Sequence, residues 1–465
     1  MAKPLFALVL AEGKGERFRS GDDDISRVIF RKSLFRMALD AVLRLNPEGT
    51  CVVLAEFRQG LREEVSERRV EFVPRSNDSG ASDPVQTVRK FLRSARGGDV
   101  LVIPADMPLI QTPMLRSLLA FHRKAGAPAT VIGPIVEKPE GSGRVSRSGD
   151  TNARNAAVNP PGHRLRTGGE AGLFPSVFDA GEINRLFSLP EKNRDGRSAL
   201  TLISRAIRDV GKRALEVPAG FADDFFRVRH PRDLARAAGV LRDRKIAELI
   251  RKGVVILDPR STWVGPNVQV GRGSVLYPSV VLEGVTTIGR LCLIYPGAHL
   301  VNSRLGSRVT VFPATVMNGA VVENEVTVGP FARLRPKTIL RAGSHVGNFV
   351  EMKHTDFGRG SKAGHLSYLG DSEIGKKVNI GAGTITCNYD GFKKNKTTIE
   401  DGAFIGSGTE LVAPVRIGRG AYIAAGSAIT RNVPSGALAF ARSRQVDKPG
   451  WAKRRREARK IRGKE

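Results

Sequence analysis

A short-period repeat in the C-terminal half of the chain constrains the fold most strongly. From about Val254, an aliphatic residue followed by glycine recurs at multiples of about six residues. Ten instances fall within about 160 residues, from "VGPNVQ" at Val264 to "IGRGAY" at Ile417. This period, with one inward aliphatic position per hexad, is typical of a parallel β-helix with three flat faces. We therefore expect such a β-helix over residues 254–440, and trimers that pair its exposed faces are the usual outcome.

Residues 1–229 follow a different pattern, in which short apolar runs alternate with helical segments. Examples are "LFALVL", "MALDAVLRL", "CVVLAEF", "VQTVRKFLRSA" and "DVLVIPADMPL". Strands that alternate with helices predict a mostly parallel, Rossmann-like α/β sheet. Residues 230–253 predict one long helix, or two in series, that links the domains. Residues 441–465 form a basic C-terminal tail.

Composition favours a soluble two-domain protein. The chain has 465 residues, 41% of them hydrophobic, and no apolar segment approaches the roughly 20 residues that a membrane span needs. We expect no membrane span and a cytoplasmic location. The three cysteines are far apart, which predicts reduced thiols.

The net charge of +29 points to polyanionic partners, of which nucleic acid, membrane headgroups and small phosphorylated substrates are the candidates. Composition alone does not choose among them. From Arg442 onward there are eleven Lys or Arg against three acids. This tail is consistent with a solvated basic helix or with a binding segment.

The densest chemistry lies between Arg333 and Tyr389, and it suits acyl transfer to an amine on an anionic sugar. An amine must lose a proton to attack a thioester, and His365 in "AGHLSY" can accept that proton because imidazole titrates near neutral pH. Glu351, about one coil earlier, is placed to orient the ring and stabilise its cation. Fixed positive charge for a sugar phosphate comes from Arg335, Lys353 and Lys394.

Two simpler interpretations of these residues remain. A histidine in a β-helix coil is commonly a turn or surface residue, and asparagine can stack in ladders between coils. A zinc site of the type that carbonic anhydrases build on this fold would need three converging histidines. The one close set is His345, His354 and His365.

The motifs "RLRP", "GNFVEMK", "KAGHLSYLGD" and "NIGAGTITCNYDG" closely resemble the bacterial bifunctional N-acetylglucosamine-1-phosphate uridylyltransferase and glucosamine-1-phosphate N-acetyltransferase family. The resemblance is nearly continuous from about Val328 to Trp451. It implies a left-handed β-helix, a homotrimer, and glucosamine-1-phosphate and acetyl-coenzyme A as substrates. It also implies His365 as general base, and sugar-phosphate contacts from Arg335, Lys353, Tyr368, Asn379 and Lys394.

The same resemblance implies an acetyl-coenzyme A site. Asn388 and Tyr389 would line it, and further contacts would come from Ala382, Ser407, Ala425 and Arg442. In the family, the segment after the β-helix packs across a neighbouring subunit and helps to close the coenzyme pocket, which "ARSRQ" followed by "PGW" fits. The cations beyond Lys453 exceed what that role requires.

The first domain keeps several landmarks of a nucleotidyltransferase. "LAEGKGERF" stands where the family has its phosphate-binding turn, and "GRVSRSGD" resembles the family's glycine-arginine strand. "LVIPADMPL" ends a buried strand with Asp106 where the first ligand of a Mg²⁺ ion belongs.

Five departures affect the parts that would do this chemistry. Glu12 and Glu16 put carboxylates beside the triphosphate, where like-charge repulsion costs on the order of a kcal/mol or more. Arg227 or Arg229 falls at the second metal-ligand position, and an arginine offers no lone pair to a metal. The other three departures are Arg27 for a lysine, Gly80, Ala81 and Asp83 at the base-binding loop, and Glu170–Gly172 at the sugar-gripping motif.

We therefore predict an acetyltransferase for the synthesis of the UDP-N-acetylglucosamine used in peptidoglycan and lipopolysaccharide, fused to a first domain that has lost, or nearly lost, uridylyl transfer. Mg²⁺ is expected as a cofactor only if that domain is active. One alternative is a weak or altered transferase in which surrounding arginines replace part of the charge of the metal, and another is a fully bifunctional enzyme that also uses UTP. Others are a noncatalytic scaffold and a nucleic-acid binder, although no specific nucleic-acid partner is predicted.

Overall fold

The computed structural model describes residues 3–11, 28–54, 59–73, 84–133, 175–188, 215–218, 226–228 and 230–462. The chain divides into two compact units, Met1–Asp243 and Arg244–Glu465. The division falls within α7 (Pro231–Arg251). The predicted linker is thus one uninterrupted helix rather than two in series, and each half of it belongs to a different unit.

The first unit is built on a seven-stranded sheet with the order β5-β4-β1-β6-β8-β7-β9. Its strands are β1 (Leu5–Ala11), β4 (Gly49–Leu54), β5 (Val70–Val73), β6 (Asp99–Pro104), β7 (Ala129–Gly133), β8 (Ser176–Asp179) and β9 (Leu215–Pro218). All neighbouring pairs are parallel except those that β8 makes with β6 and β7. The short hairpin of β2 (Val28–Ile29) and β3 (Lys32–Ser33) is separate.

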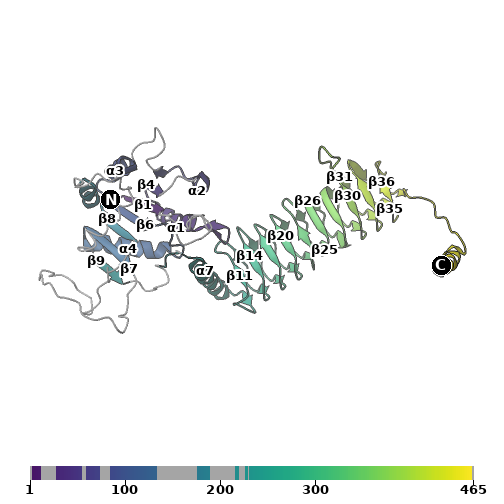
Figure 1. The fold of residues 1–465 in the computed structure, drawn as a ribbon, viewed down its shortest axis with the longest axis horizontal. Helices are drawn as coiled ribbons and strands as arrows, with labels where there is room; N and C mark the ends of the chain where they lie inside the picture. The colour runs from purple at the N-terminus through teal and green to yellow at the C-terminus, as the bar shows by residue number, and fades with distance from the viewer. Residues whose placement is uncertain are drawn as a thin grey trace. The chain divides into compact units, whose positions relative to one another are not determined.

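Helices cover both faces of this sheet (Figure 1). Leu8 and Leu10 of β1 pack in one core with residues of α3 (Pro84–Ser94) and α5 (Ala180–Ser188). The alternate residue Val9 packs in the other core with residues of α1 (Leu34–Leu43) and α4 (Thr112–Ala125). A short helix, α2 (Gln59–Glu63), follows β4. The predicted α/β fold of the first domain is confirmed.

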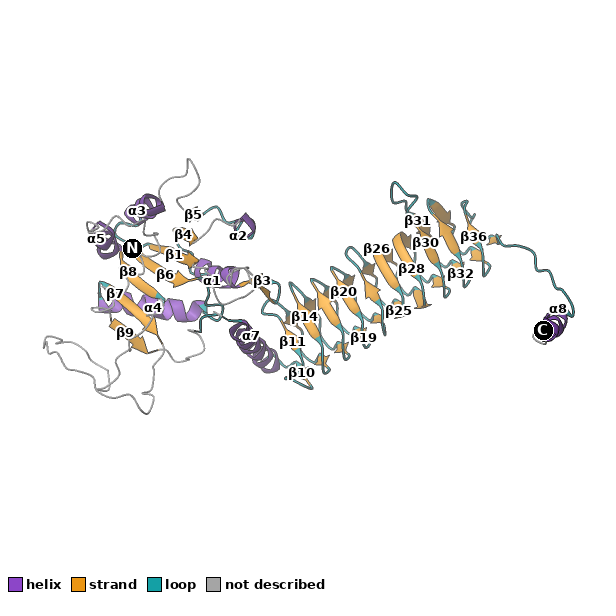
Figure 2. Ribbon diagram, viewed as in Figure 1, coloured by secondary structure: helices purple, strands orange, loops and turns teal. Residues whose placement is uncertain are grey.

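The second unit is a parallel β-helix that runs from β10 (Val255–Ile256) to β37 (Leu438–Ala439). Short strands stack coil upon coil into an 11-stranded sheet and a 17-stranded sheet, and the cross-pairings within the larger sheet divide it into two faces. Figure 2 shows these strands as successive rungs. The predicted parallel β-helix is confirmed.

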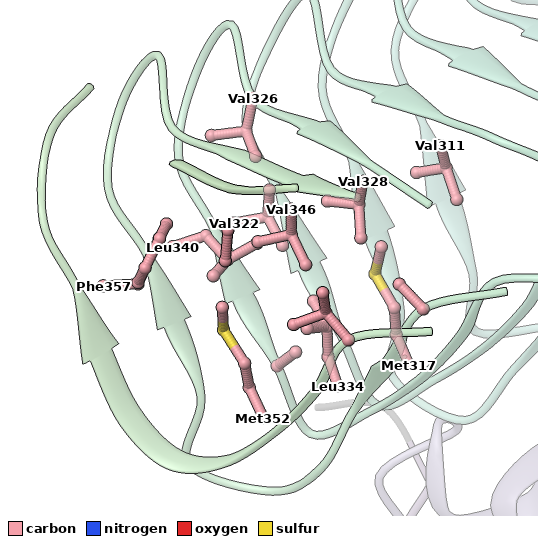
Figure 3. Packing of buried hydrophobic residues seen from close by; sticks show 14 of the residues in the cluster. Val311, Met317, Val322, Val326, Val328, Leu334, Leu340, Val346, Met352 and Phe357 are labelled. Carbon is pink, nitrogen blue, oxygen red and sulfur yellow. The ribbon is translucent and has the colours of Figure 1, made fainter. Parts of the chain in front are cut away.

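The interior of the β-helix is filled by the aliphatic residues that open the hexads. Val328, Val346, Ile380 and Ile405 are at most 3% exposed. Figure 3 shows part of this core, in which Met352 and Phe357 pack among Val322, Leu340 and Val346. Each hexad therefore supplies one buried side chain, as its period predicts, and the corners between faces are left for other functions.

The basic tail ends in a helix, α8 (Trp451–Arg462), and every residue from 440 to 459 is exposed. Among the residues that the structure describes, no helix is both long and apolar enough to cross a bilayer. All three cysteines are free thiols, as predicted. Burial raises the pKa of Cys51 to about 12, so this thiol is unreactive.

Candidate active site

One corner of the β-helix brings together residues that the sequence predicts for two different roles. The strands β25 (His345–Asn348), β27 (Lys362–His365), β29 (Asn379–Ile380), β32 (Phe404–Ile405) and β35 (Tyr422–Ile423) lie side by side with their first residues in register. Three positions after the first residue of each strand, the chain has Asn348, His365, Ala382, Ser407 and Ala425, in that order. We call these five positions the column. The predicted base thus shares a column with three of the predicted acetyl-coenzyme A residues.

The next coil extends this column. The guanidinium Nη1 of Arg442 donates a hydrogen bond to the carbonyl oxygen of Ala425 at 2.9 Å. Successive coils are separated by about 4.8 Å, the spacing of hydrogen-bonded strands. His365 and Ala425 are three coils apart, so the column between them is about 14 Å long.

The residue that follows each column position changes from a large apolar residue to glycine after the coil of His365. In the coil of His365 and in the two coils before it, this residue is large and apolar: Phe331, Phe349 and Leu366 are 54%, 55% and 60% exposed. In the coils after that of His365 it is a glycine with positive φ, namely Gly383, Gly408 and Gly426. The corner beyond His365 therefore has no bulky side chains, and its backbone is open to a long, thin molecule.

His365 ends β27, and its side chain is exposed. Its Nδ1 lies 2.5 Å from Oδ1 of Asn348, the residue paired with it in the sheet. Because a carboxamide oxygen only accepts hydrogen bonds, the neutral form of the ring carries its proton on Nδ1 and its lone pair on Nε2. Within the described part of the chain Nε2 has no partner, so it is available as a base.

The residue that contacts the His365 ring is Asn348 and not Glu351, for which the sequence suggested an orienting role. Glu351 begins β26 (Glu351–Phe357), where it pairs with Tyr368 on the adjoining face rather than with His365. Its Oε1 accepts a hydrogen bond from Nη1 of Arg335 at 3.0 Å. In the isolated chain Glu351 is therefore the counterion of Arg335. Sequence reasoning did not identify Asn348.

Of the cations predicted for the sugar phosphate, Arg335 and Lys353 lie on this adjoining face, and Lys394 contacts Lys353 from a neighbouring loop. Contact with the Lys394 ammonium is the main cause that lowers the pKa of Lys353, and the charge of Arg335 adds to the effect, although Asp371 opposes it. Cations that repel one another in this way are more stable when an anion joins them. The arrangement therefore suits a phosphate group.

Asn388, Tyr389 and Lys394 belong to the loop between β30 (Ile385–Cys387) and β31 (Thr397–Ile399). Tyr389 and Lys394 form an antiparallel bridge, and the hydroxyl of Tyr389 donates to the carbonyl oxygen of Gly391 at 2.6 Å. The backbone N–H groups of Lys393 and Phe392 lower the pKa of Asp390 to about 2 by hydrogen bonding to its carboxylate. The loop is thus a hairpin with its own internal hydrogen bonds.

Tyr368 and Asn388 meet above Gly370. A Cβ added at Gly370 would lie 2.5 Å from the Tyr368 hydroxyl and 2.8 Å from Asn388 Nδ2. Gly370 therefore allows these two predicted site residues to come together. Asn379 is placed differently, because it begins β29 on the flat face that precedes Ala382.

Three histidines considered as a zinc site have separate partners. Nδ1 of His345 lies 2.7 Å from Oγ1 of Thr327, and Nδ1 of His354 lies 2.9 Å from Oδ1 of Asp371. The third, His365, faces Asn348. Among the described residues, no three metal-ligating side chains converge.

In the first unit, Asp106 follows β6 and is buried. Nε of Arg227 donates to both of its carboxylate oxygens, at 2.9 and 2.7 Å, and Nη2 lies 2.7 Å from Oδ2. Both side chains are at most 15% exposed. The carboxylate predicted to bind a metal is thus neutralised by an arginine.

The other departures in the first domain lie outside the described residues. These are Glu12, Glu16, Arg27, Gly80, Ala81, Asp83, Glu170–Gly172 and Arg229. The arginine that contacts Asp106 is Arg227, one of the two candidates for the second ligand position.

Comparison with known proteins gives two domain families. The MobA-like NTP transferase domain matches residues 7–143, and the bacterial transferase hexapeptide (six repeats) matches residues 396–431. "Bifunctional protein GlmU" of Thermotoga petrophila is 39% identical over 456 residues, which cover 97% of this chain and 99% of that protein. The protein of the same name from Thermodesulfovibrio yellowstonii is 34% identical, with the same coverage.

The chain belongs to the GlmU family.

GlmU membership confirms the family resemblance and the prediction of an acyltransferase enzyme with a hexapeptide-repeat domain. It also confirms the nucleotidyltransferase-like character of the first domain. A solved 4-diphosphocytidyl-2C-methyl-D-erythritol synthase aligns with 51% of this GlmU chain and 97% of its own, at 16% identity and a TM-score of 0.33.

Proposed function

We propose that this member of the GlmU family transfers the acetyl group of acetyl-coenzyme A to the amine of glucosamine-1-phosphate, in the synthesis of UDP-N-acetylglucosamine. The neutral amine nitrogen attacks the thioester carbonyl, and Nε2 of His365 takes a proton from that nitrogen. The new N–C bond forms, the C–S bond breaks, and the coenzyme leaves as a thiol after its sulfur gains the proton that His365 took up. The observation that carries the proposal is the single column of His365, Ala382, Ser407 and Ala425.

The length and openness of this column support the assignment of the coenzyme. An extended pantetheine arm could lie along the corner past Gly383, Gly408 and Gly426, with its thioester at His365. Arg442, beside Ala425, is then placed for a coenzyme phosphate. Asn388 and Tyr389, from their loop, are proposed to line the thioester end.

The sugar phosphate is assigned to the cations on the adjoining face. Arg335 offers a planar fork, and Lys353 and Lys394 add two ammonium groups. Tyr368 and Asn379 are proposed to complete the contacts to the sugar. In this arrangement, Glu351 positions Arg335 and stands by the sugar rather than by the imidazole.

We propose that the active unit is a homotrimer. The exposed column of Phe331, Phe349 and Leu366 supports this proposal, because all three occupy the left-handed region at a cost of roughly 1–2 kcal/mol each. Large apolar side chains that are both strained and exposed suit an interface with a second copy. That interface would adjoin His365.

Replacement of His365 tests the catalytic assignment. His365→Ala should lower acetyl transfer by roughly two to four orders of magnitude, measured as release of coenzyme A thiol. His299→Ala, in a distant coil, serves as the control and should retain normal activity. A loss below tenfold in the His365 variant would rule out the general-base role.

We further propose that the first domain has lost, or nearly lost, uridylyl transfer. The observation behind this is the Asp106 carboxylate, which is fully engaged by Arg227. A Mg²⁺ ion would have to displace a guanidinium that makes two hydrogen bonds and carries charge of the same sign as the metal.

The match of residues 7–143 to an NTP transferase domain favours the alternative of a fully bifunctional enzyme. Electron paramagnetic resonance of Mn²⁺, added with UTP, separates the two. We expect no bound Mn²⁺ at millimolar concentration, whereas stoichiometric binding would support the alternative.

A further inference from the structure

Two strands cross a corner of the β-helix without a break beside the proposed site. These are β26 (Glu351–Phe357) and β28 (Tyr368–Ile374), which pair on both sides of the corner. At the corner itself stand His354 and Asp371, with φ of 50° and 47°. Both residue types tolerate this left-handed conformation better than most. The bend of each strand thus places an imidazole directly above a carboxylate.

The carboxylate of Asp371 connects this corner to the proposed site. Its Oδ1 lies 2.9 Å from Nδ1 of His354, and its Oδ2 accepts a hydrogen bond from Nδ2 of Asn388 at 2.5 Å. The three side chains form a chain of contacts that runs from an exposed histidine to a buried amide. Neither His354 nor Asp371 is assigned a role in the proposed reaction.

Burial and charge make this connection stiff. The Asp371 side chain is 13% exposed, and Asn388 is 8% exposed. Burial alone would raise the pKa of Asp371, but hydrogen bonds from His354 and Asn388 outweigh it and lower the pKa. The carboxylate is therefore ionised at neutral pH, and charge-assisted hydrogen bonds hold its partners more firmly than neutral ones would.

Asn388 in turn anchors the loop that presents other site residues. The backbone N–H of Asn395 donates to the carbonyl oxygen of Asn388 at 2.7 Å, which closes the hairpin onto this residue. Tyr389 and Lys394 lie between these two ends. A displacement of Asn388 would therefore be passed to the whole loop.

We infer that His354 and Asp371 are positioning residues for acetyl transfer, which hold Asn388 and, through it, the loop of residues 388–395. The inference rests on the proposed function. The contact between His354 and Asp371 would hold this loop in place for acetyl-coenzyme A, because Asn388 and Tyr389 are the groups proposed to line the coenzyme site. His354 itself touches no reacting atom and acts through Asp371.

Full-length variants test this role. His354→Ala removes the contact, His354→Gln keeps a donor of similar reach, and Asp371→Asn removes the charge. His299→Ala is the matched control, because Nε2 of His299 lies 3.0 Å from Oε2 of Glu283 in a similar exposed pair far along the β-helix. The backbone N–H of His354 keeps its hydrogen bond to Pro336, so the coil should form without the side chain.

We expect His354→Ala to raise KM for acetyl-coenzyme A about fivefold to twentyfold, since a charge-assisted hydrogen bond is lost, while kcat changes less than about threefold. His354→Gln should return KM to within about threefold of the wild type, and Asp371→Asn should resemble His354→Ala. His299→Ala should leave both constants unchanged. A KM within twofold of the wild type in both His354→Ala and Asp371→Asn would overturn the inference.

A second readout does not depend on activity. Phe392 is 97% exposed at the tip of the loop, so the rate of chymotryptic cleavage after it, followed by mass spectrometry, reports loop order. Cleavage should be about fivefold faster in His354→Ala than in the wild type or His299→Ala. An unchanged rate would overturn the inference. Absence of acetyl transfer in the wild type would instead refute the proposed function, and the cleavage assay would still measure the contact.

Discussion

Replacing Gly370 with alanine should damage the proposed active site by displacing two of its side chains. Gly370 lies in β28, and no left-handed φ requires a glycine there. The added methyl group would meet the Tyr368 hydroxyl at 2.5 Å and Asn388 Nδ2 at 2.8 Å. Both contacts are with side chains of the proposed site.

The expected magnitude follows from these distances. Ordinary van der Waals contact begins at 3.4 Å, so the Tyr368 hydroxyl must retreat by about 0.9 Å and the Asn388 amide by about 0.6 Å. A displacement near 1 Å can cost about 100-fold in rate, and we expect kcat/KM to fall about 30- to 100-fold. Overpacking should also lower the free energy of unfolding by about 1–3 kcal/mol.

Gly306→Ala is the matched control. Its methyl group would lie 2.4 Å from Oδ1 of Asn324 and 2.9 Å from two backbone atoms, so the clash is at least as severe, in a coil that holds none of the proposed site residues. Thiol release should be measured for both variants, with circular dichroism and thermal unfolding to establish the folded fraction. If Gly370→Ala kept kcat/KM within threefold of the wild type, Tyr368 and Asn388 would not be working parts of the site. Equal losses in both variants would attribute the effect to destabilisation.

Three further predictions concern single contacts. Asn348→Ala should lower kcat/KM about tenfold to a hundredfold, because His365 loses its orientation and its fixed tautomer; thiol release within threefold of the wild type would contradict this. Lys394→Ala should raise KM for glucosamine-1-phosphate at least about tenfold while KM for acetyl-coenzyme A rises less, and equal changes in both constants would count against a phosphate site. Arg227→Ala should destabilise the first unit by about 2–4 kcal/mol in urea unfolding, whereas Arg185→Ala, which removes an exposed pair, should cost far less. A cost for Arg227→Ala no larger than that control would show that its contact with Asp106 is weak.

The repeat was enough to predict the β-helix, which brings several of the proposed site residues into one column. In a β-helix, residues one coil apart face the same way, so the hexads that bury Val346 and Ile380 also fix which residues stand at the next corner. That regularity places His365 and Ala382 in one column. Family motifs supplied the roles, and the coil geometry supplied the arrangement.

The sequence did not predict contacts that depend on small offsets between coils. His365 lies 17 residues after Asn348, a full coil, whereas Glu351 lies past the corner on the next face. "About one coil earlier" describes both residues, and the exact pairing decides between them. The contact of Asp371 with Asn388 was missed for a similar reason, because it joins a strand to an inserted loop that breaks the repeat.

In the first domain, the sequence left Arg227 and Arg229 as equal candidates for the second ligand position. A backbone hydrogen bond explains why Arg227 contacts Asp106. The N–H of Val228 donates to the carbonyl oxygen of Asp106 at 2.9 Å. That hydrogen bond brings the neighbouring Arg227 within reach of the Asp106 carboxylate. No pattern of residue types alone could specify this register between two distant segments.

The most direct test of the central claim is to incubate the purified full-length protein and Mg²⁺ with two substrate pairs in parallel. One pair is acetyl-coenzyme A with glucosamine-1-phosphate, followed by free thiol, and the other is UTP with N-acetylglucosamine-1-phosphate, followed by pyrophosphate. We predict thiol release that is abolished by His365→Ala, and little or no pyrophosphate. Pyrophosphate at a rate comparable to that of thiol would contradict the claim, and would show that Arg227 does not keep a metal from Asp106.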